Sequence, residues 1–199
     1  MAVGLICVAA APASAAQPIV RVEEDWELVV GEPDLTTNGP QVTTVITPLN
    51  NVNGVHATFE VNHQTQPGYV AGGMQVQVWN GETPVAAKKG SKDGQLHHAG
   101  EAVRWTQSME LQGGNLIFEV SDGNSSSWGT FGGQGYLRLS VGTSLSNLNG
   151  YNPDCSADHT GIGYGSNRVA ILVLKEVRIY DAQGLIATDS TQRVVHESQ

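Results

Sequence analysis

The sequence predicts an all-β protein, a two-layer antiparallel β-sandwich whose simplest form is a jelly roll. Residues 168–181 alternate in polarity as the residues of a strand do, and about ten such extended segments follow one another, with turn residues roughly every eight to twelve positions. No segment repeats its apolar residues with the period of a helix. Short strands at this spacing favour two packed sheets over a barrel.

The clearest strand signal lies in residues 168–181. Its apolar side chains share one parity, interrupted only by Lys175, namely Val169, Ile171, Val173, Val177 and Ile179. Because successive side chains of a strand point to opposite faces, this pattern predicts one face that is apolar throughout. Residues 181–184 then supply a turn, and residues 185–187 can return as a short partner strand.

The remaining elements are expected in chain order by the same reasoning. Asn80-Gly81 is the strongest hairpin signal, because both residues tolerate the positive φ of a type I′ turn. Two long connections are expected, residues 122–135, which are too glycine-rich for regular structure, and residues 147–166. Further strands are expected at residues 20–30, 42–46, 55–63, 74–79, 83–87, 103–111, 116–120 and 136–141.

The amino terminus predicts a secretory signal peptide over residues 1–16. Residues 1–11 are apolar, uncharged and too short to span a bilayer, and the small residues that follow suit cleavage after Ala15 or Ala16. No Lys or Arg precedes the apolar run, which indicates that the natural start lies upstream. A buried strand and lipidation at Cys7 are the alternatives. We therefore expect a secreted, extracellular or periplasmic protein without a membrane span, in which residues 17–199 form a single β-sandwich domain.

Charge and cysteine content set further limits. The formal net charge is -9, from 19 acidic and 10 basic residues, so nucleic acid is not an expected partner, because its phosphates would be repelled. After the predicted leader, Cys155 is the one cysteine in the sequence. Stability is therefore expected to come from burial of apolar surface and not from a disulfide.

Several short motifs carry a resemblance to known domains. Residues 177–181, with the sequence V-R-I-Y-D, resemble the closing strand of concanavalin A-like and laminin-G-like domains, and Gly161-Ile162-Gly163 is similar to the glycine-flanked strand before it. Ser127-Trp128-Gly129 and Asn167-Arg168-Val169 resemble parts of a group of uncharacterised secreted bacterial proteins. The resemblance covers mainly the carboxy-terminal half. It implies a concanavalin A-like sandwich, a fold whose loops often hold structural calcium.

Aromatic residues in the loops are candidate platforms for a glycan. A sugar ring packs its apolar face on an aromatic side chain, while amides and carboxylates bind its hydroxyls. The alternative for each such residue is that the ring plugs an end of the sandwich and the amide caps a turn. The predicted ligand-binding residues are Trp128, Phe131, Tyr151, Tyr164, Asn124 and Asn152.

The candidate metal ligands are Asp154 and Asp158. Both are carboxylates on the connection over residues 147–166, close to Asn152, and calcium prefers oxygen ligands of this kind. No other cofactor is expected.

Recognisable catalytic motifs are missing from the sequence. Retaining glucanases of this architecture carry E-x-D-x-x-E on one strand, which does not occur here, and Glu119 and Asp122 would face opposite sides of an extended chain. Neither G-x-S-x-G nor H-E-x-x-H is present. The leading hypothesis is a non-catalytic module that binds a glycan or another extracellular polymer. The alternatives are a structural or self-assembling surface protein, which would form homo-oligomers through an uncovered edge strand, and a polysaccharide hydrolase.

Overall fold

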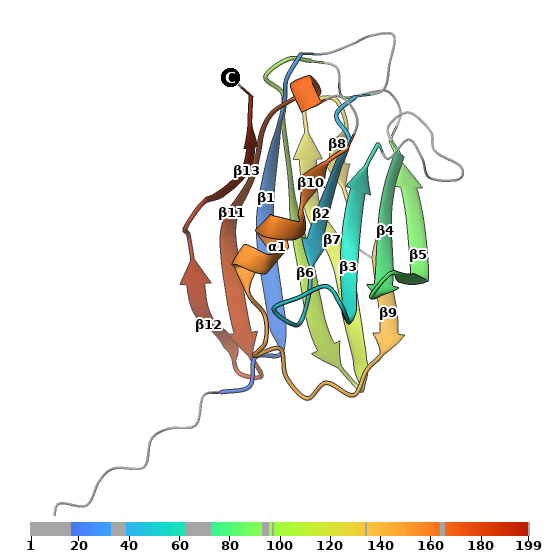
Figure 1. Cartoon of the computed structure of the whole chain (residues 1–199), viewed down its shortest axis with the longest axis vertical. Helices are drawn as coiled ribbons and strands as arrows, with labels where there is room; N and C mark the ends of the chain where they lie inside the picture. Colours follow the sequence, from blue (N-terminus) through green and yellow to red (C-terminus); the bar gives the residue numbers. More distant parts are fainter. Residues whose placement is uncertain are drawn as a thin grey trace, which may run out of the picture.

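The structure of the protein is a computed structural model, which describes residues 17–32, 39–62, 73–92, 96, 98–133, 135–163 and 166–198. Its strands form two antiparallel sheets, one of eight strands and one of five, that lie against each other (Figure 1). The prediction of an all-β protein with two antiparallel sheets is confirmed. The predicted signal peptide, residues 1–16, lies outside the described residues.

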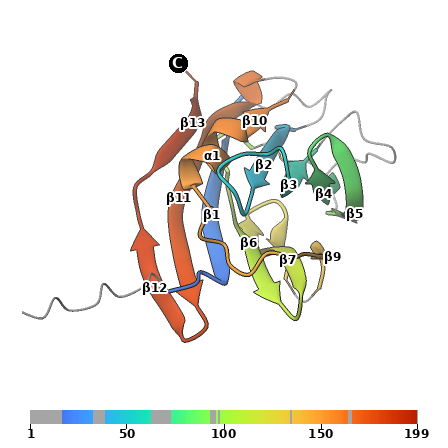
Figure 2. The same ribbon diagram turned by 60° about the horizontal axis from the view of Figure 1, so that its bottom comes forward.

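The eight-stranded sheet has the strand order β12-β11-β1-β6-β7-β8. In addition β13 pairs with β11, so that β12 and β13 follow the same edge (Figure 2), and β9 pairs with β7. The strands are β1 (Arg21–Val30), β6 (Ala102–Gln112), β7 (Asn115–Ser125), β8 (Gly129–Phe131), β9 (Arg138–Gly142), β11 (Val169–Asp181), β12 (Gly184–Asp189) and β13 (Arg193–Glu197).

The five-stranded sheet has the strand order β10-β2-β3-β4-β5. Strands β4 and β5 form the hairpin that Asn80-Gly81 predicts, with Gly81 at a φ of 57°. The strands are β2 (Val42–Ile46), β3 (Val55–Val61), β4 (Gly73–Asn80), β5 (Thr83–Ser91) and β10 (Gly161–Ile162).

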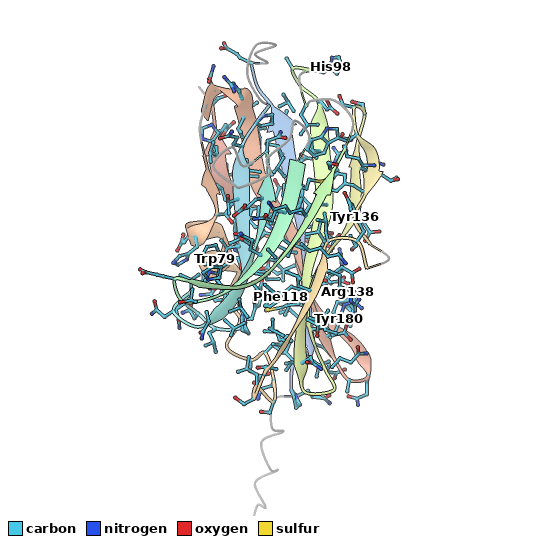
Figure 3. All side chains as sticks on the ribbon, turned by 90° about the vertical axis from the view of Figure 1, so that its right-hand side faces the viewer. Trp79, His98, Phe118, Tyr136, Arg138 and Tyr180 are labelled. Atoms are coloured by element: carbon cyan, nitrogen blue, oxygen red, sulfur yellow. The ribbon has the colours of Figure 1, made fainter. Side chains whose placement is uncertain are left out.

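The core lies between the two sheets and contains several large rings. Phe59 of β3 meets Trp105 of β6 edge to face, with the ring centroids 5.5 Å apart, and Trp26 and Phe118 are also buried there. Each sheet therefore has one face in the core and one face turned away from it. Figure 3 shows the two outer faces on opposite sides of the molecule, Trp79 on one and Arg138 and Tyr180 on the other.

Strand β11 does not keep the single apolar parity that the sequence predicts. Its core-facing residues are Val169, Leu172, Leu174 and Val177. Its pairing with β1 skips two residues, Ala170 and Lys175, and each is the extra residue of a register shift. A β-bulge moves the following side chain to the opposite parity, so two bulges change the parity of the buried side chains twice. The prediction that Ile171 and Val173 share the core face with Val169 is therefore wrong.

A short helix occurs in the connection expected over residues 147–166. Helix α1 (Pro153–His159) starts at Asn152, whose side chain accepts a hydrogen bond from the Asp154 backbone N–H at 3.0 Å. The helix contacts β2 of one sheet and β13 of the other, and covers one open side of the sandwich (Figures 1 and 2). A 3₁₀ turn, η1 (Ser166–Arg168), precedes β11. No described helix has the length and apolar character that crossing a membrane requires.

Candidate functional site

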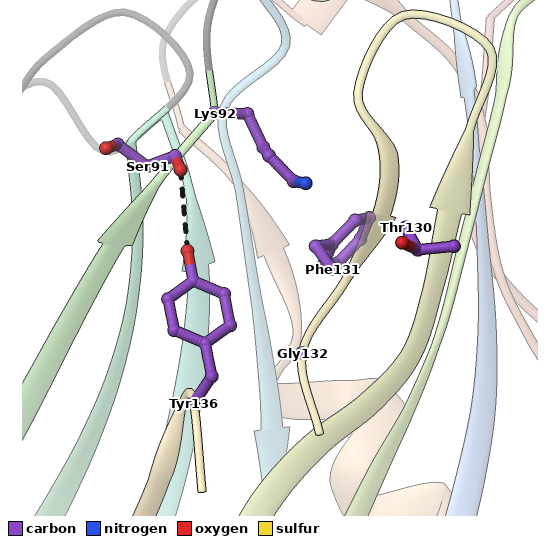
Figure 4. A pocket seen from close by; sticks show the side chains of 6 residues that line it. All are labelled: Ser91, Lys92, Thr130, Phe131, Gly132 and Tyr136. Atoms are coloured by element: carbon purple, nitrogen blue, oxygen red, sulfur yellow. Dashed lines mark hydrogen bonds between the residues drawn. The ribbon is translucent and has the colours of Figure 1, made fainter. Parts of the chain in front are cut away.

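Two adjoining pockets lie on the side of the sandwich where β5 faces β8 and β9. The first pocket, which we call the inter-sheet pocket, lies between the end of β5 and β8 (Figure 4). Its volume is about 450 Å³. The β7 pocket, about 460 Å³, adjoins it and shares Thr130, Phe131 and Gly132. The inter-sheet pocket is lined by Ser91, Lys92, Thr130, Phe131, Gly132 and Tyr136. The β7 pocket is lined by Ser121, Asp122, Gly123, Asn124, Thr130, Phe131, Gly132 and Gly133.

The glycine-rich loop after β8 forms hydrogen bonds to both sheets beside these pockets. Towards the eight-stranded sheet, the Gly133 N–H donates to the Val120 carbonyl at 2.8 Å. Towards the five-stranded sheet, Lys88 Nζ donates to the Gly135 carbonyl at 2.7 Å. Gly132 has a φ of 77° and lies so close to the Val120 carbonyl that an added Cβ would overlap it. The loop therefore needs glycine at this position to follow β7.

A second anchor positions the turn between β7 and β8. The Glu101 carboxylate accepts hydrogen bonds from the Ser127 backbone N–H and from the Ser127 hydroxyl, both at 2.6 Å. Burial alone would raise the pKa of Glu101, but these bonds and those of the neighbouring serines lower it below its ordinary value. An ionised Glu101 thus fixes the turn that leads into β8 and the pocket wall.

Two predicted aromatic platforms lie in the core. The side chains of Trp128 and Phe131 are each 5% exposed and meet edge to face, with their ring centroids 5.8 Å apart. They therefore present no open ring face to a sugar in this conformation, although Phe131 contributes to the wall of both pockets. The aromatic residue that borders the inter-sheet pocket with a half-buried side chain is Tyr136, which the sequence analysis does not select.

The other predicted ligand-binding residues are spread over the molecule. Asn124 is exposed and lines the β7 pocket, next to Phe131. Tyr151 and Asn152 lie instead at the start of α1, where the Tyr151 hydroxyl donates to Glu24 at 2.8 Å and Asn152 caps the helix. Tyr164 lies outside the described residues. The structure thus brings Asn124 and Phe131 together and places Tyr151 and Asn152 elsewhere.

The candidate calcium ligands lie on α1. Asp154 pairs with Arg193 of β13, with 2.5 Å between its Oδ1 and the guanidinium Nε, and Asp158 is exposed. The described part of the chain holds no group of three or more His, Cys, Asp and Glu residues that could bind a metal ion. Structural calcium at Asp154 and Asp158 stays a prediction.

A buried carboxyl group under α1 is a feature that the sequence pattern hides. Glu24 of β1 faces the core and is fully buried, with hydrogen bonds from Tyr151 and from the Trp26 indole N–H at 3.0 Å. Burial raises its pKa to about 7, against the opposing effects of the Ser156 and Tyr151 hydroxyls, the Trp26 indole and the charge of Arg193. Glu24 lies inside the sandwich, so it has no open site beside it.

The outer face of the five-stranded sheet holds a second carboxyl group with a raised pKa. Glu60 of β3 accepts a hydrogen bond from the Gln75 amide at 3.3 Å, and burial raises its pKa to about 7 while these contacts and the nearby Lys89 charge oppose the rise. Glu60 is the one carboxyl group among the outward-facing residues of β2, β3, β4 and β5 that the structure describes. A hydrolytic pair of carboxylates is therefore not assembled by these strand residues.

Three carboxylates do share a face on β1. Glu23, Asp25 and Glu27 point to the outer side of the eight-stranded sheet, and Asp25 and Glu27 line a third pocket of about 310 Å³. Each is bound by an arginine, because Arg178 contacts Glu23 and Asp25 and Arg104 contacts Glu27. This row was not predicted from the sequence, although its alternate spacing places three side chains on one face of a strand without a bulge.

Comparison with known proteins adds no family for this chain. No protein-family model matches it, and no curated protein sequence matches it.

Proposed function

We propose that the protein is a secreted, non-catalytic binding module for a glycan or another extracellular polymer, with its site at the inter-sheet and β7 pockets. The observation that carries this proposal is the continuous pair of open pockets around Thr130, Phe131 and Gly132. Binding sites for small ligands are usually concave and carry a few polar groups that fix the orientation of the ligand. These two pockets are lined mainly by polar residues and glycines, with the Phe131 and Tyr136 rings beside them.

The lining groups suit the chemistry of a sugar. Ser91, Thr130 and Asn124 carry hydroxyl and amide groups that form no hydrogen bond in the described structure, and all three side chains are exposed. The half-buried Tyr136 ring borders the same space. An aromatic ring beside free hydroxyl and amide groups can pack on a pyranose and bind its hydroxyls. We place the platform at Tyr136 instead of Trp128.

The proposal includes a jelly roll of the concanavalin A-like type. It is supported by the two antiparallel sheets and by β11, whose residues Val177 to Asp181 carry the resemblance to a closing strand. Predicted secretion rests on the apolar residues 1–11 and the small residues after them.

The experiment is affinity electrophoresis of the protein and two variants through a panel of dissolved polysaccharides. Tyr136→Ala removes the proposed platform and is expected to weaken retention by about tenfold, the loss of one good aromatic contact. Tyr180→Ala is the matched control, because Tyr180 is also half-buried but lies on the outer face of the eight-stranded sheet (Figure 3). It is expected to leave retention unchanged.

Two results would contradict the proposal. One is that no polysaccharide in the panel retards the unmodified protein, and the other is that Tyr136→Ala and Tyr180→Ala behave alike. Thermal unfolding of both variants is measured alongside. If Tyr136→Ala unfolds at the assay temperature, Asn124→Ala replaces it, since the Asn124 side chain is exposed and its removal opens no core cavity.

A polysaccharide hydrolase is the second candidate, favoured by the row Glu23, Asp25 and Glu27 beside the third pocket. Glycoside hydrolysis uses a pair of carboxyl groups on the two sides of the scissile bond, and carboxylates that share one face of a strand can supply such a pair. The arginines oppose it, because a general acid needs a raised pKa and ion pairs with Arg178 and Arg21 help to lower that of Glu23. Turnover of any polysaccharide that Glu27→Gln abolishes would establish hydrolysis, and absence of turnover across the panel would remove it.

A further inference from the structure

We infer that the inter-sheet pocket binds an acidic sugar unit, whose carboxylate or sulfate group is recognised by Lys92. This inference rests on the proposed function and names the class of glycan. It follows from the position of a lysine in the wall of this pocket and from the lack of a partner for it among the described residues.

Lys92 of the pocket belongs to a group of lysines at the end of β5, of which Lys89 lies near Glu60 on the outer face of the sheet. Lys88, Lys89 and Lys92 fall within five residues at the end of β5, and the remaining lysine of the sequence is Lys175. The protein as a whole carries a formal charge of -9. On such a background, Lys92 gives the pocket a local positive charge that attracts an anion at short range.

Most other cations are neutralised within the fold. The guanidinium groups of five arginines each contact a carboxylate, and these are Arg21, Arg104, Arg138, Arg178 and Arg193. Lys88 donates to the Gly135 carbonyl, and Lys89 lies close enough to Glu60 to lower its pKa. Lys92 forms no hydrogen bond or ion pair in the part of the chain that the structure describes. It is therefore free to bind a ligand.

The direction of the Lys92 side chain fits this role. Alternate residues of β5 point to the same side, and Lys88 and Gly90 contact the loop that carries Tyr136. Lys92 continues this parity, and Figure 4 shows its side chain extending between Ser91 and Phe131 towards the pocket. Its half-buried position strengthens a charge-assisted hydrogen bond relative to one on a fully exposed lysine.

The other groups of the pocket complete a site for a charged ring. Tyr136 supplies an aromatic surface and Thr130 an exposed hydroxyl, whereas the Ser91 hydroxyl points away from Lys92 (Figure 4). A neutral sugar would use the ring and the Thr130 hydroxyl alone. An acidic sugar adds the contact with Lys92, so the pocket distinguishes the two by one ion pair.

The experiment is isothermal titration of the full chain with three hexasaccharides: a hexagalacturonate, its full methyl ester and a sulfated hexaglucan. The methyl ester keeps the ring and removes the charge. The acid is expected to bind at least about tenfold more tightly than the ester, the magnitude of one charge-assisted hydrogen bond. Equal binding of acid and sulfated ligand identifies a general anion site, and preference for the acid identifies a carboxylate site. Both support the inference.

Lys92→Gln is expected to bring the affinity for the acid down to that for the ester. Lys175→Gln is the matched control, because Lys175 is also half-buried and without a partner in the described structure but lies on β11. It is expected to change nothing. The inference is overturned if acid and ester bind equally, if Lys92→Gln keeps the difference, or if Lys175→Gln removes it. If acid and ester bind equally and Tyr136→Ala abolishes the binding, the proposed function stands and only the acidic specificity is refuted. If no ligand binds, the proposed function and the acidic specificity are both refuted.

Discussion

The Tyr136 ring lies directly on Gly90, so closely that an added Cβ at Gly90 would overlap the phenol carbon and oxygen atoms. The Tyr136 hydroxyl also donates to the Ser91 carbonyl at 3.5 Å. Tyr136 belongs to the loop that follows β8, whereas Gly90 and Ser91 belong to β5 of the other sheet. One glycine therefore lets the two sheets approach and sets the position of the ring beside the inter-sheet pocket.

Alanine substitutions at two glycines should show that this contact is more easily relieved than a similar one in the core. Gly123 lies against the Phe131 ring as Gly90 lies against Tyr136, but Phe131 is buried and cannot move aside, while the far end of Tyr136 can. We expect Gly123→Ala to cost about 3 kcal/mol and Gly90→Ala about 1 kcal/mol, the two ends of the overpacking range. Urea unfolding measures both. Equal losses would show that the Tyr136 ring is as fixed as that of Phe131.

The buried carboxyl group of Glu24 predicts a pH dependence of stability. Its pKa of about 7 in the folded protein exceeds the ordinary value of 4.5, so the folded state keeps a proton that the unfolded chain releases between these values. Stability therefore falls as the pH rises from about 4.5 to 7, by about 3 kcal/mol for this group, and levels off above. Glu60 adds a fall in the same window.

Glu24→Gln should remove that share of the pH dependence. Glutamine keeps the shape and can still accept the Trp26 hydrogen bond, but it does not titrate. Urea unfolding of both proteins at several pH values between 4.5 and 8 is the measurement. A variant curve with the same slope as that of the unmodified protein would mean that Glu24 is already ionised in the folded state.

The ion pairs on the outer face of β1 and β11 predict that arginine and lysine are not equivalent at position 178. Arg178 contacts Asp25 through two nitrogens and Glu23 through Nε at 2.8 Å. Lysine keeps the charge but lacks the planar set of guanidinium donors that contacts two carboxylates. Arg178→Lys is therefore expected to lower the free energy of unfolding by about 1 kcal/mol, and by less at high salt. Denaturant unfolding at low and high NaCl checks this. A variant as stable as the unmodified protein would show that charge alone matters there.

Cys155 is predicted to react slowly with alkylating reagents. Burial raises the pKa of its thiol, and the charges of Asp158 and Glu24 raise it further, so the thiolate is scarce at neutral pH. Iodoacetamide labelling at pH 7.5, followed by mass analysis of the peptide that contains Cys155, should show rapid reaction only after unfolding. Rapid labelling of the folded protein would indicate that α1 opens readily.

The strands could be predicted from the sequence because the polarity of their residues alternates over several positions. Residues 55–61 and 74–79 follow the simple alternation, and the structure has strands there. The bulges of β11 could not be predicted from the sequence, because Ala170 and Lys175 are residue types that also occur at paired positions of a strand. Helix α1 has seven residues, too few to show a period, and its one local signal is Asn152-Pro153.

The candidate site was predicted only in part, and the reason is physical. Trp128 and Phe131 stand among glycines, yet the turn before β8 and β8 itself place their rings in the core, where they contact each other. Loop composition identifies exposed backbone but not the direction of a ring. The lysines at 88, 89 and 92 are a signal that charge counting over short windows could have found. The row Glu23, Asp25 and Glu27 needed only the period of a strand.

The most direct test of the account is a titration of ¹⁵N-labelled protein with hexagalacturonate, followed by amide chemical shifts. The largest changes are expected at residues 91–92, 130–132 and 136, and with Lys92→Gln the same changes are expected to need about tenfold more ligand. Changes centred on Asp25 and Glu27, on the start of α1, or nowhere would contradict it.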